Sequence, residues 1–147
     1  MIHVCLVIII IVIINIIIYH LALFSLEAAV TKLEDFPSNP SIATEAQDLT
    51  LVWNYTLGGS VFLGRIFIIS DGKEDEIARR ELNSPTNVQG KYKLQGRFYA
   101  NISDTHAWLR ILQVQQSDGG QYAFSLFIRG SSDNLRNELE VVVYCKY

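Results

Sequence analysis

Residues 108–124, WLRILQVQQSDGGQYAF, constrain the fold of this chain more than any other stretch. Leu109 and Ile111 lie two positions apart, which places both side chains on one face of a strand. An Asp-Gly-Gly turn follows, and a second alternating run begins at Tyr122 and Phe124. Two strands of this kind, joined through a tight turn, indicate a β-sheet with one buried face.

The chain keeps this pattern from Ile42 onward. Short apolar runs are separated by turn residues at regular intervals, no helical period persists beyond one turn, and no internal repeat occurs. Such spacing is typical of an all-β sandwich or barrel. We expect strands at residues 48–56, 61–69, 76–82, 93–100, 106–112, 121–128 and 137–144.

The N-terminus has a different composition. Residues 2–26 contain no Asp, Glu, Lys or Arg and are mostly aliphatic, so a helix there has no polar face. One interpretation is a secretory signal peptide that is cut near Ala28 and Ala29. The other is an uncleaved membrane anchor, since about 20 apolar residues span a bilayer. Either interpretation sends the following residues into the secretory pathway.

Domain boundaries follow from these patterns. Residues 1–29 are the expected signal peptide or signal-anchor helix, and residues 30–41, which include two prolines, are the expected connector. The folded domain is predicted at 42–144, and 145–147 form a C-terminal end where the chain is expected to stop short of a longer protein.

The chain has two cysteines, Cys5 in the apolar N-terminus and Cys145 near the other end. An exported domain that keeps Cys145 alone forms no disulfide within itself. Three interpretations stay open: a bond to a partner outside the domain, a chain that ends before the partner cysteine, and an unpaired thiol.

The composition argues against several functions. The net charge of −3 and the scattered basic residues give no nucleic-acid-binding patch. His106 is the single histidine after residue 30, and no G-x-S-x-G motif occurs, so neither an ordinary zinc site nor a serine nucleophile is indicated. The acidic run at 74–76 suits a solvated hairpin better than a weak calcium site. We expect no enzyme activity, cofactor or metal.

The spacing within residues 108–124 is L-x-I-x-x-V-x-x-x-D-x-G-x-Y-x-F. It resembles the strand E to strand F segment of an immunoglobulin V-set domain, with Tyr122 as the tyrosine corner. The resemblance covers residues 42–144 and implies a V-type β-sandwich of two antiparallel Greek-key sheets. It also implies that Arg97, in the sequence GRF, pairs with Asp118 at one end of the sandwich.

The chain departs from this family pattern at the sandwich centre. The two disulfide positions hold Trp53 and Phe124, and Ile66, Phe67 or Ile68 replaces the usual strand C tryptophan. A disulfide closing such a loop contributes about 4 kcal/mol. Burial of one aromatic side chain contributes about 4–6 kcal/mol before entropy costs. We therefore expect Trp53 to pack on Phe124 in place of the disulfide, and similar domains occur among carcinoembryonic-antigen-type adhesion proteins and invertebrate allorecognition proteins.

The family's G, F, C and C′ strands form one sheet, and its outer face is the expected binding face. Alternation turns one side-chain set of strands C and F outward. An apolar surface with an arginine at its edge has the composition of a recognition surface. The alternative is that these residues belong to a broader core. The residues in question are Leu63, Phe67, Ile69, Ser125, Phe127 and Arg129.

Two N-glycosylation sequons fall on the opposite sheet. Asn54 lies in N-Y-T on the first long strand, and Asn101 lies in N-I-S at the turn after strand D. Glycans at both positions are expected to screen that sheet and to leave the G-F-C-C′ face bare.

The resemblance implies an extracellular module that binds another cell-surface protein, in adhesion or in self/non-self recognition. A second copy of the chain is one candidate partner. The alternatives are a spacer or outer fragment of a longer receptor and a secreted decoy or defence factor. Contact with a membrane is expected only through the N-terminal segment or through regions beyond residue 147.

Overall fold

The computed structural model describes residues 13–14, 31–130, 132 and 134–145. The chain divides into two units, Met1–Val30 and Thr31–Tyr147. In the first unit only residues 13–14 are described, and they are helical. The signal-peptide and anchor predictions, and Cys5, therefore lie outside the described residues. Within the described part of the chain, no helix is long and apolar enough to span a bilayer.

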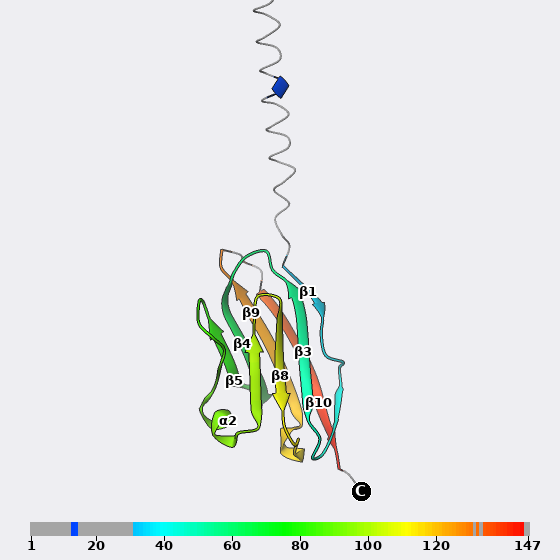
Figure 1. Ribbon diagram of the computed structural model, residues 1–147. Helices are drawn as coiled ribbons and strands as arrows, with labels where there is room; N and C mark the ends of the chain where they lie inside the picture. Colours follow the sequence, from blue (N-terminus) through cyan, green and yellow to red (C-terminus); the bar gives the residue numbers. More distant parts are fainter. Residues whose placement is uncertain (1–12, 15–30, 131, 133, 146–147) are drawn as a thin grey trace, which may run out of the picture. The chain divides into compact units, whose positions relative to one another are not determined.

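The second unit is built from two β-sheets (Figure 1). The four-stranded sheet has the strand order β1-β3-β8-β7, and the six-stranded sheet has the order β2-β10-β9-β4-β5-β6. Neighbouring strands are antiparallel except β2 and β10, which run parallel. The strands are β1 Lys32–Asp35, β2 Ser41–Thr44, β3 Leu49–Thr56, β4 Val61–Ser70, β5 Lys73–Glu81, β6 Asn87–Val88, β7 Phe98–Ile102, β8 His106–Ile111, β9 Gly120–Ile128 and β10 Asn134–Tyr144. Two short helices, α2 Gly90–Gln95 and η1 Gln116–Asp118, lie in the connections.

The core lies between the inner faces of the two sheets. On β3 and β9 alternate side chains point into it, as the period of two predicts. These inward residues are Leu49, Leu51, Trp53, Tyr55, Tyr122, Phe124, Leu126 and Ile128. The predicted all-β sandwich is confirmed.

Ile66 occupies the place of the missing strand C tryptophan. It is fully buried and is the Cα partner of Phe124, so the register of β4 is now defined. Gly64 lies two residues earlier, where an added Cβ would come within 2.7 Å of Ile102 Cγ2 on the facing sheet. Only glycine permits the two sheets to approach each other so closely at this point.

The expected connector at 30–41 contains a strand. β1 pairs with β3 at the edge of the four-stranded sheet, and β2 then begins at Ser41 in the other sheet. The sequence hides β1 because Leu33 alone packs against the core, while its neighbours are exposed and charged. The domain therefore begins about ten residues before the predicted boundary at residue 42.

The strand predicted at 93–100 starts later, at Phe98. The preceding residues form α2, in which Tyr92 is buried and packs edge to face on Phe98 with ring centroids 4.9 Å apart. Gly96 ends the helix in the left-handed conformation, with φ of 66°. A helix of six residues leaves no helical period in the sequence, so its alternating side chains resemble those of a strand.

Candidate protein-binding face

Stacked aromatic rings join the two sheets at their centre. Trp53 on β3 and Phe124 on β9 are both fully buried, with ring centroids 5.2 Å apart and an interplanar angle of 24°. Tyr55 also stacks on Phe124, at 5.6 Å. The contact that the sequence predicts between Trp53 and Phe124 is therefore present where the family pattern has a disulfide.

Sequence reasoning missed Asn137, which completes this central stack. Trp53 Nε1 donates a hydrogen bond of 2.8 Å to Asn137 Oδ1. Asn137 is the Cα partner of Phe124 and shares the inward phase of β10 with buried Leu139 and Val141. The sequence signal for Asn137 is a polar residue at an inward-facing position of a strand. Such a residue can accept the hydrogen bond that a buried indole N–H needs.

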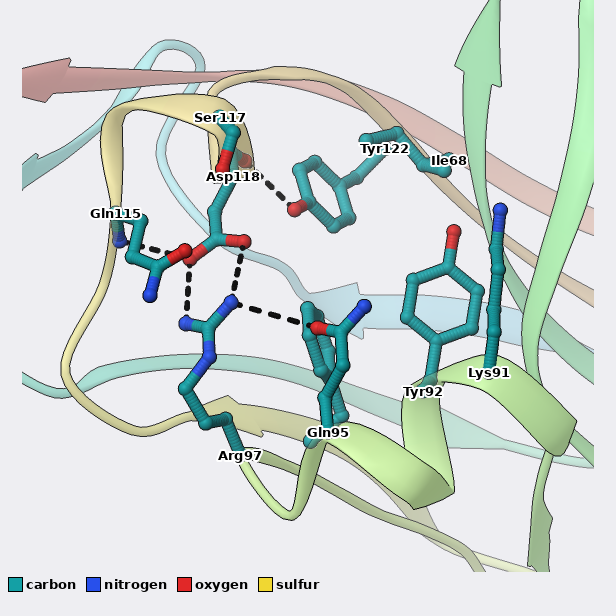
Figure 2. A pocket seen from close by; sticks show the side chains of 10 residues that line it. Ile68, Lys91, Tyr92, Gln95, Arg97, Gln115, Ser117, Asp118 and Tyr122 are labelled. Carbon is teal, nitrogen blue, oxygen red and sulfur yellow. Dashed lines mark hydrogen bonds and ion pairs between the residues drawn. The ribbon is translucent and has the colours of Figure 1, made fainter.

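A second junction lies at one end of the sandwich (Figure 2). Arg97 donates two hydrogen bonds to the Asp118 carboxylate, of 2.8 and 3.1 Å. The Gln115 backbone N–H donates to the same carboxylate at 2.8 Å, and the Tyr122 hydroxyl donates to the Asp118 backbone carbonyl at 2.7 Å. The bond to Asp118 raises the pKa of the Arg97 guanidinium. We call these four residues the corner.

A hollow of about 560 Å³ opens beside the corner and is visible in Figure 2. Its charged groups already have partners: Lys91 pairs with Asp75, and Arg97 pairs with Asp118. The Tyr92 hydroxyl donates to Asp75 at 2.8 Å, and burial raises the pKa of Tyr92. No histidine or cysteine occurs among the described residues that line the hollow. These contacts join α2 to β5 and Arg97 to η1.

The outer face of the six-stranded sheet carries interlinked charges, which we call the face network. The guanidinium groups of Arg65 on β4 and Arg136 on β10 lie 5.1 and 4.9 Å from the ring centroid of Phe67. Glu74 on β5 contacts both arginines, at 3.3 and 3.1 Å. Further ion pairs join Arg65 to Glu76, Arg79 to Glu76, and Arg136 to Glu138.

The face network corrects the expectation of a bare apolar surface. Phe67 is fully buried beneath the two arginines, and Ser125 is 4% exposed. Ser125 is the Cα partner of both Arg65 and Arg136, and its hydroxyl has no hydrogen-bond partner among the described residues. The alternation of side chains along a strand predicts the face of the sheet on which a side chain lies. It does not predict that neighbouring long side chains fold over that side chain.

One group of apolar residues on this sheet, Phe62, Leu63 and Phe127, lies at one end of the face, and we call it the loop-end patch. Leu63 on β4 is the Cα partner of Phe127 on β9, and both are half-buried. Phe62 is 55% exposed and accepts a backbone hydrogen bond from Leu82. A hollow of about 240 Å³ opens here, lined by Phe62, Leu63, Arg79, Glu81 and Leu82.

The other predicted face residues lie apart from one another. Arg129 is exposed just after β9 and therefore lies near the loop-end patch. Ile69 is half-buried, and its Cα partners are Glu74 and Gln121 toward the other end of the sheet. The structure thus brings Leu63, Phe127 and Arg129 to one end and leaves Ile69 at the other.

Both sequon asparagines lie on the four-stranded sheet. Asn54 is on β3 opposite His106, and Asn101 is on β7 opposite Trp108. Asn101 lies inside its strand rather than in the following turn. Both side chains are half-buried. In addition, no group of three metal-ligating side chains occurs in the described part of the chain.

Comparisons with known proteins identify the fold. No protein-family model and no curated protein matches this chain. A chain from the structural study of T cell specificity and activation by the bacterial superantigen toxic shock syndrome toxin-1 aligns with a TM-score of 0.60 at 15% identity, over 79% of this chain and 99% of that one. Murine CRIg aligns with a TM-score of 0.59 at 15% identity, over 80% and 99%. Titin M4 aligns with 0.53 at 10%, over 80% and 98%. The fold is an immunoglobulin-like β-sandwich.

Proposed function

We propose that this chain is an extracellular V-type module that binds another cell-surface protein through the loop-end patch. β5 and β6 support the V-type assignment, because they extend the sheet beyond β4 as the added strands of variable-type domains do. The immunoglobulin-like structural neighbours favour a binding module.

The observation that carries the proposal is the composition of the loop-end patch. An exposed phenylalanine, Phe62, borders a hollow that is rimmed by Arg79 and Glu81. Protein interfaces combine an apolar centre with a polar rim in this way, and a protruding apolar side chain of a partner fits such a hollow. The face network beside the patch supplies charges that favour some partners over others.

Glycans on the other sheet complete the proposal. Sugars at Asn54 and Asn101 cover the outer face of the four-stranded sheet, and the six-stranded sheet has no sequon on its described strands. Docking through the six-stranded sheet then meets no carbohydrate.

The test uses the whole chain, displayed on cells and also prepared as a soluble multimer. Phe62→Asp and Phe127→Asp each place a charge in the loop-end patch. We expect either change to weaken binding about tenfold or more, as truncation of a central apolar contact does. Leu94→Asp is the matched control, because Leu94 is 89% exposed on α2, away from the loop-end patch.

Circular dichroism first establishes that all three variants are folded. Sedimentation at rising concentration then tests whether the partner is a second copy of the chain. A monomer that still binds cells identifies a different partner. Binding that is equal in all three variants, or absent for the unmodified chain, contradicts the proposal.

A further inference from the structure

The outer face of the four-stranded sheet exposes apolar side chains beside a sequon. Trp108 on β8 is half-buried there, and its Cα partners are Val52 on β3 and Asn101 on β7. Val52 is 40% exposed, and Tyr99, two residues before Asn101 on the same face, is 49% exposed. Apolar side chains that adjoin one another on a surface point to a contact more than single exposed ones do.

We propose that the cover is the chain's own N-linked glycan at Asn101, whose first sugar packs on the Trp108 ring. This inference rests on the proposed function to the extent that the chain must enter the secretory pathway. Side chains directly opposite on neighbouring strands have Cβ atoms about 5 Å apart, so a sugar on the Asn101 amide starts next to the indole. The C–H groups of a sugar face suit the electron-rich face of an aromatic ring.

The state of the Asn101 side chain agrees with this assignment. The nearby side-chain hydrogen bonds belong to the two residues that follow it: the Ile102 N–H donates to the Thr86 hydroxyl, and the Ser103 hydroxyl contacts His106 Nδ1. A sugar on the Asn101 amide breaks neither of them. Asn101 is half-buried on the outward face of β7.

Asn54 provides a built-in comparison. It lies on the same face but in the next row, where its Cα partner is His106 rather than Trp108. A glycan at Asn54 therefore starts beside an imidazole and a charged strand, β1, whose Asp35 lies on its other side. The two sequons thus differ in the ring that their first sugar meets.

Tryptophan fluorescence makes the assignment measurable. The chain has two tryptophans, and Trp53 is fully buried, so a quencher in water such as acrylamide reaches Trp108. The full chain is expressed in a eukaryotic secretory host, and glycopeptide mass spectrometry establishes occupancy at each sequon. Enzymatic trimming to one N-acetylglucosamine then isolates the first sugar.

We expect Asn101 to be glycosylated and acrylamide quenching to fall about twofold or more relative to the sugar-free chain, since a stacked sugar covers the part of the half-buried ring that water reaches. Asn101→Gln, like complete enzymatic deglycosylation, should restore the quenching. Asn54→Gln should leave it unchanged. Trp108→Phe should remove the quenchable signal and so identify its source.

Two results overturn the inference: an unmodified Asn101 in secreted chain, or quenching that is the same with and without its sugar. Failure of secretion with the chain's own N-terminus counts against the proposed function instead. A version with a foreign secretion signal ahead of the whole chain still tests Asn101.

Discussion

The two junctions between the sheets use different physical means. At the centre, the stack of Trp53 and Phe124 is fully buried and apolar except for one hydrogen bond from the indole. At the corner, Arg97, Asp118 and Tyr122 are joined by directed hydrogen bonds, two of which are charge-assisted. The centre is therefore sensitive to volume, and the corner is sensitive to the removal of single polar atoms.

This difference explains why the sandwich folds without an inter-sheet disulfide. A disulfide acts mainly on the unfolded chain, whereas burial of aromatic surface acts on the folded state. Rings that stack across the interior also fill the space that two small cysteines would leave empty. The packing of the aromatic rings at the centre takes the place of the missing disulfide. The corner holds a different part of the sandwich, at one end.

The largest expected effect is at the centre. Phe124→Ala removes the ring that stacks on both Trp53 and Tyr55, and it leaves a cavity between the sheets. We expect the free energy of unfolding to fall by about 3–5 kcal/mol. Denaturant titration of the folded domain measures this change.

Leu94→Ala is the control for an apolar truncation without burial, since Leu94 is 89% exposed. Its cost should stay within about 0.5 kcal/mol. A cost below about 1.5 kcal/mol for Phe124→Ala would mean that other contacts hold the sheets together.

The next largest effect is at the corner. Asp118→Ala leaves the Arg97 guanidinium without its partner, and only 18% of the Arg97 side chain is exposed. We expect a loss of about 2–4 kcal/mol, because an unpaired, partly buried charge costs more than the pair contributes. The same titration measures it.

Arg97→Ala, made alone and in the Asp118→Ala background, completes a double-mutant cycle. A coupling energy near zero between the two positions would show that the ion pair does not join the sheets.

Alkaline pH should weaken both junctions for one shared reason. Burial raises the pKa of Tyr55 at the centre and of Tyr122 at the corner above the ordinary tyrosine value. The unfolded chain therefore ionises first. The free energy of unfolding is unaffected by these tyrosines below about pH 10. Above that pH it falls by about 1.4 kcal/mol per buried tyrosine for each pH unit.

Thermal unfolding at pH 8 and pH 11 checks this prediction. Tyr122→Phe costs about 1 kcal/mol at pH 8, because it removes the hydrogen bond to Asp118. At pH 11 the difference between this variant and the unmodified chain should shrink or reverse. Tyr55→Phe should behave in the same way. A pH slope that neither substitution reduces would assign alkaline unfolding to other groups.

The sequence predicts the sandwich well because alternation reports burial directly. The inward phases of β3 and β9, the stack of Trp53 on Phe124 and the partner of Arg97 all follow from residues whose environment is set by strand geometry. The elements that it misses are those with little burial. β1 packs through Leu33 alone, and the six-residue helix α2 buries only Tyr92.

The exposure of residues on the candidate face was harder to predict, because it depends on where the long side chains of neighbouring residues lie. Phe67 leaves its strand outward, as alternation requires, yet Arg65 and Arg136 cover its ring. Their positions depend on Glu74, which comes from another strand of the sheet. Pairings across several strands are set by register, and the register of β4 shifts near Leu63 and again near Phe67.

The smallest expected effect is in the face network. Glu74→Gln removes a carboxylate that contacts Arg65 and Arg136, but 36% of the Glu74 side chain and 44% of the Arg136 side chain are exposed. Water and salt screen such pairs, so we expect a loss of about 0.5 kcal/mol that vanishes in 1 M salt. Asp118→Ala should keep most of its cost in the same salt, because burial protects the corner. A cost for Glu74→Gln that is as large and as resistant to salt as that of Asp118→Ala would make the face network a third structural junction. The charges beside the loop-end patch would then stabilise the fold rather than select a partner.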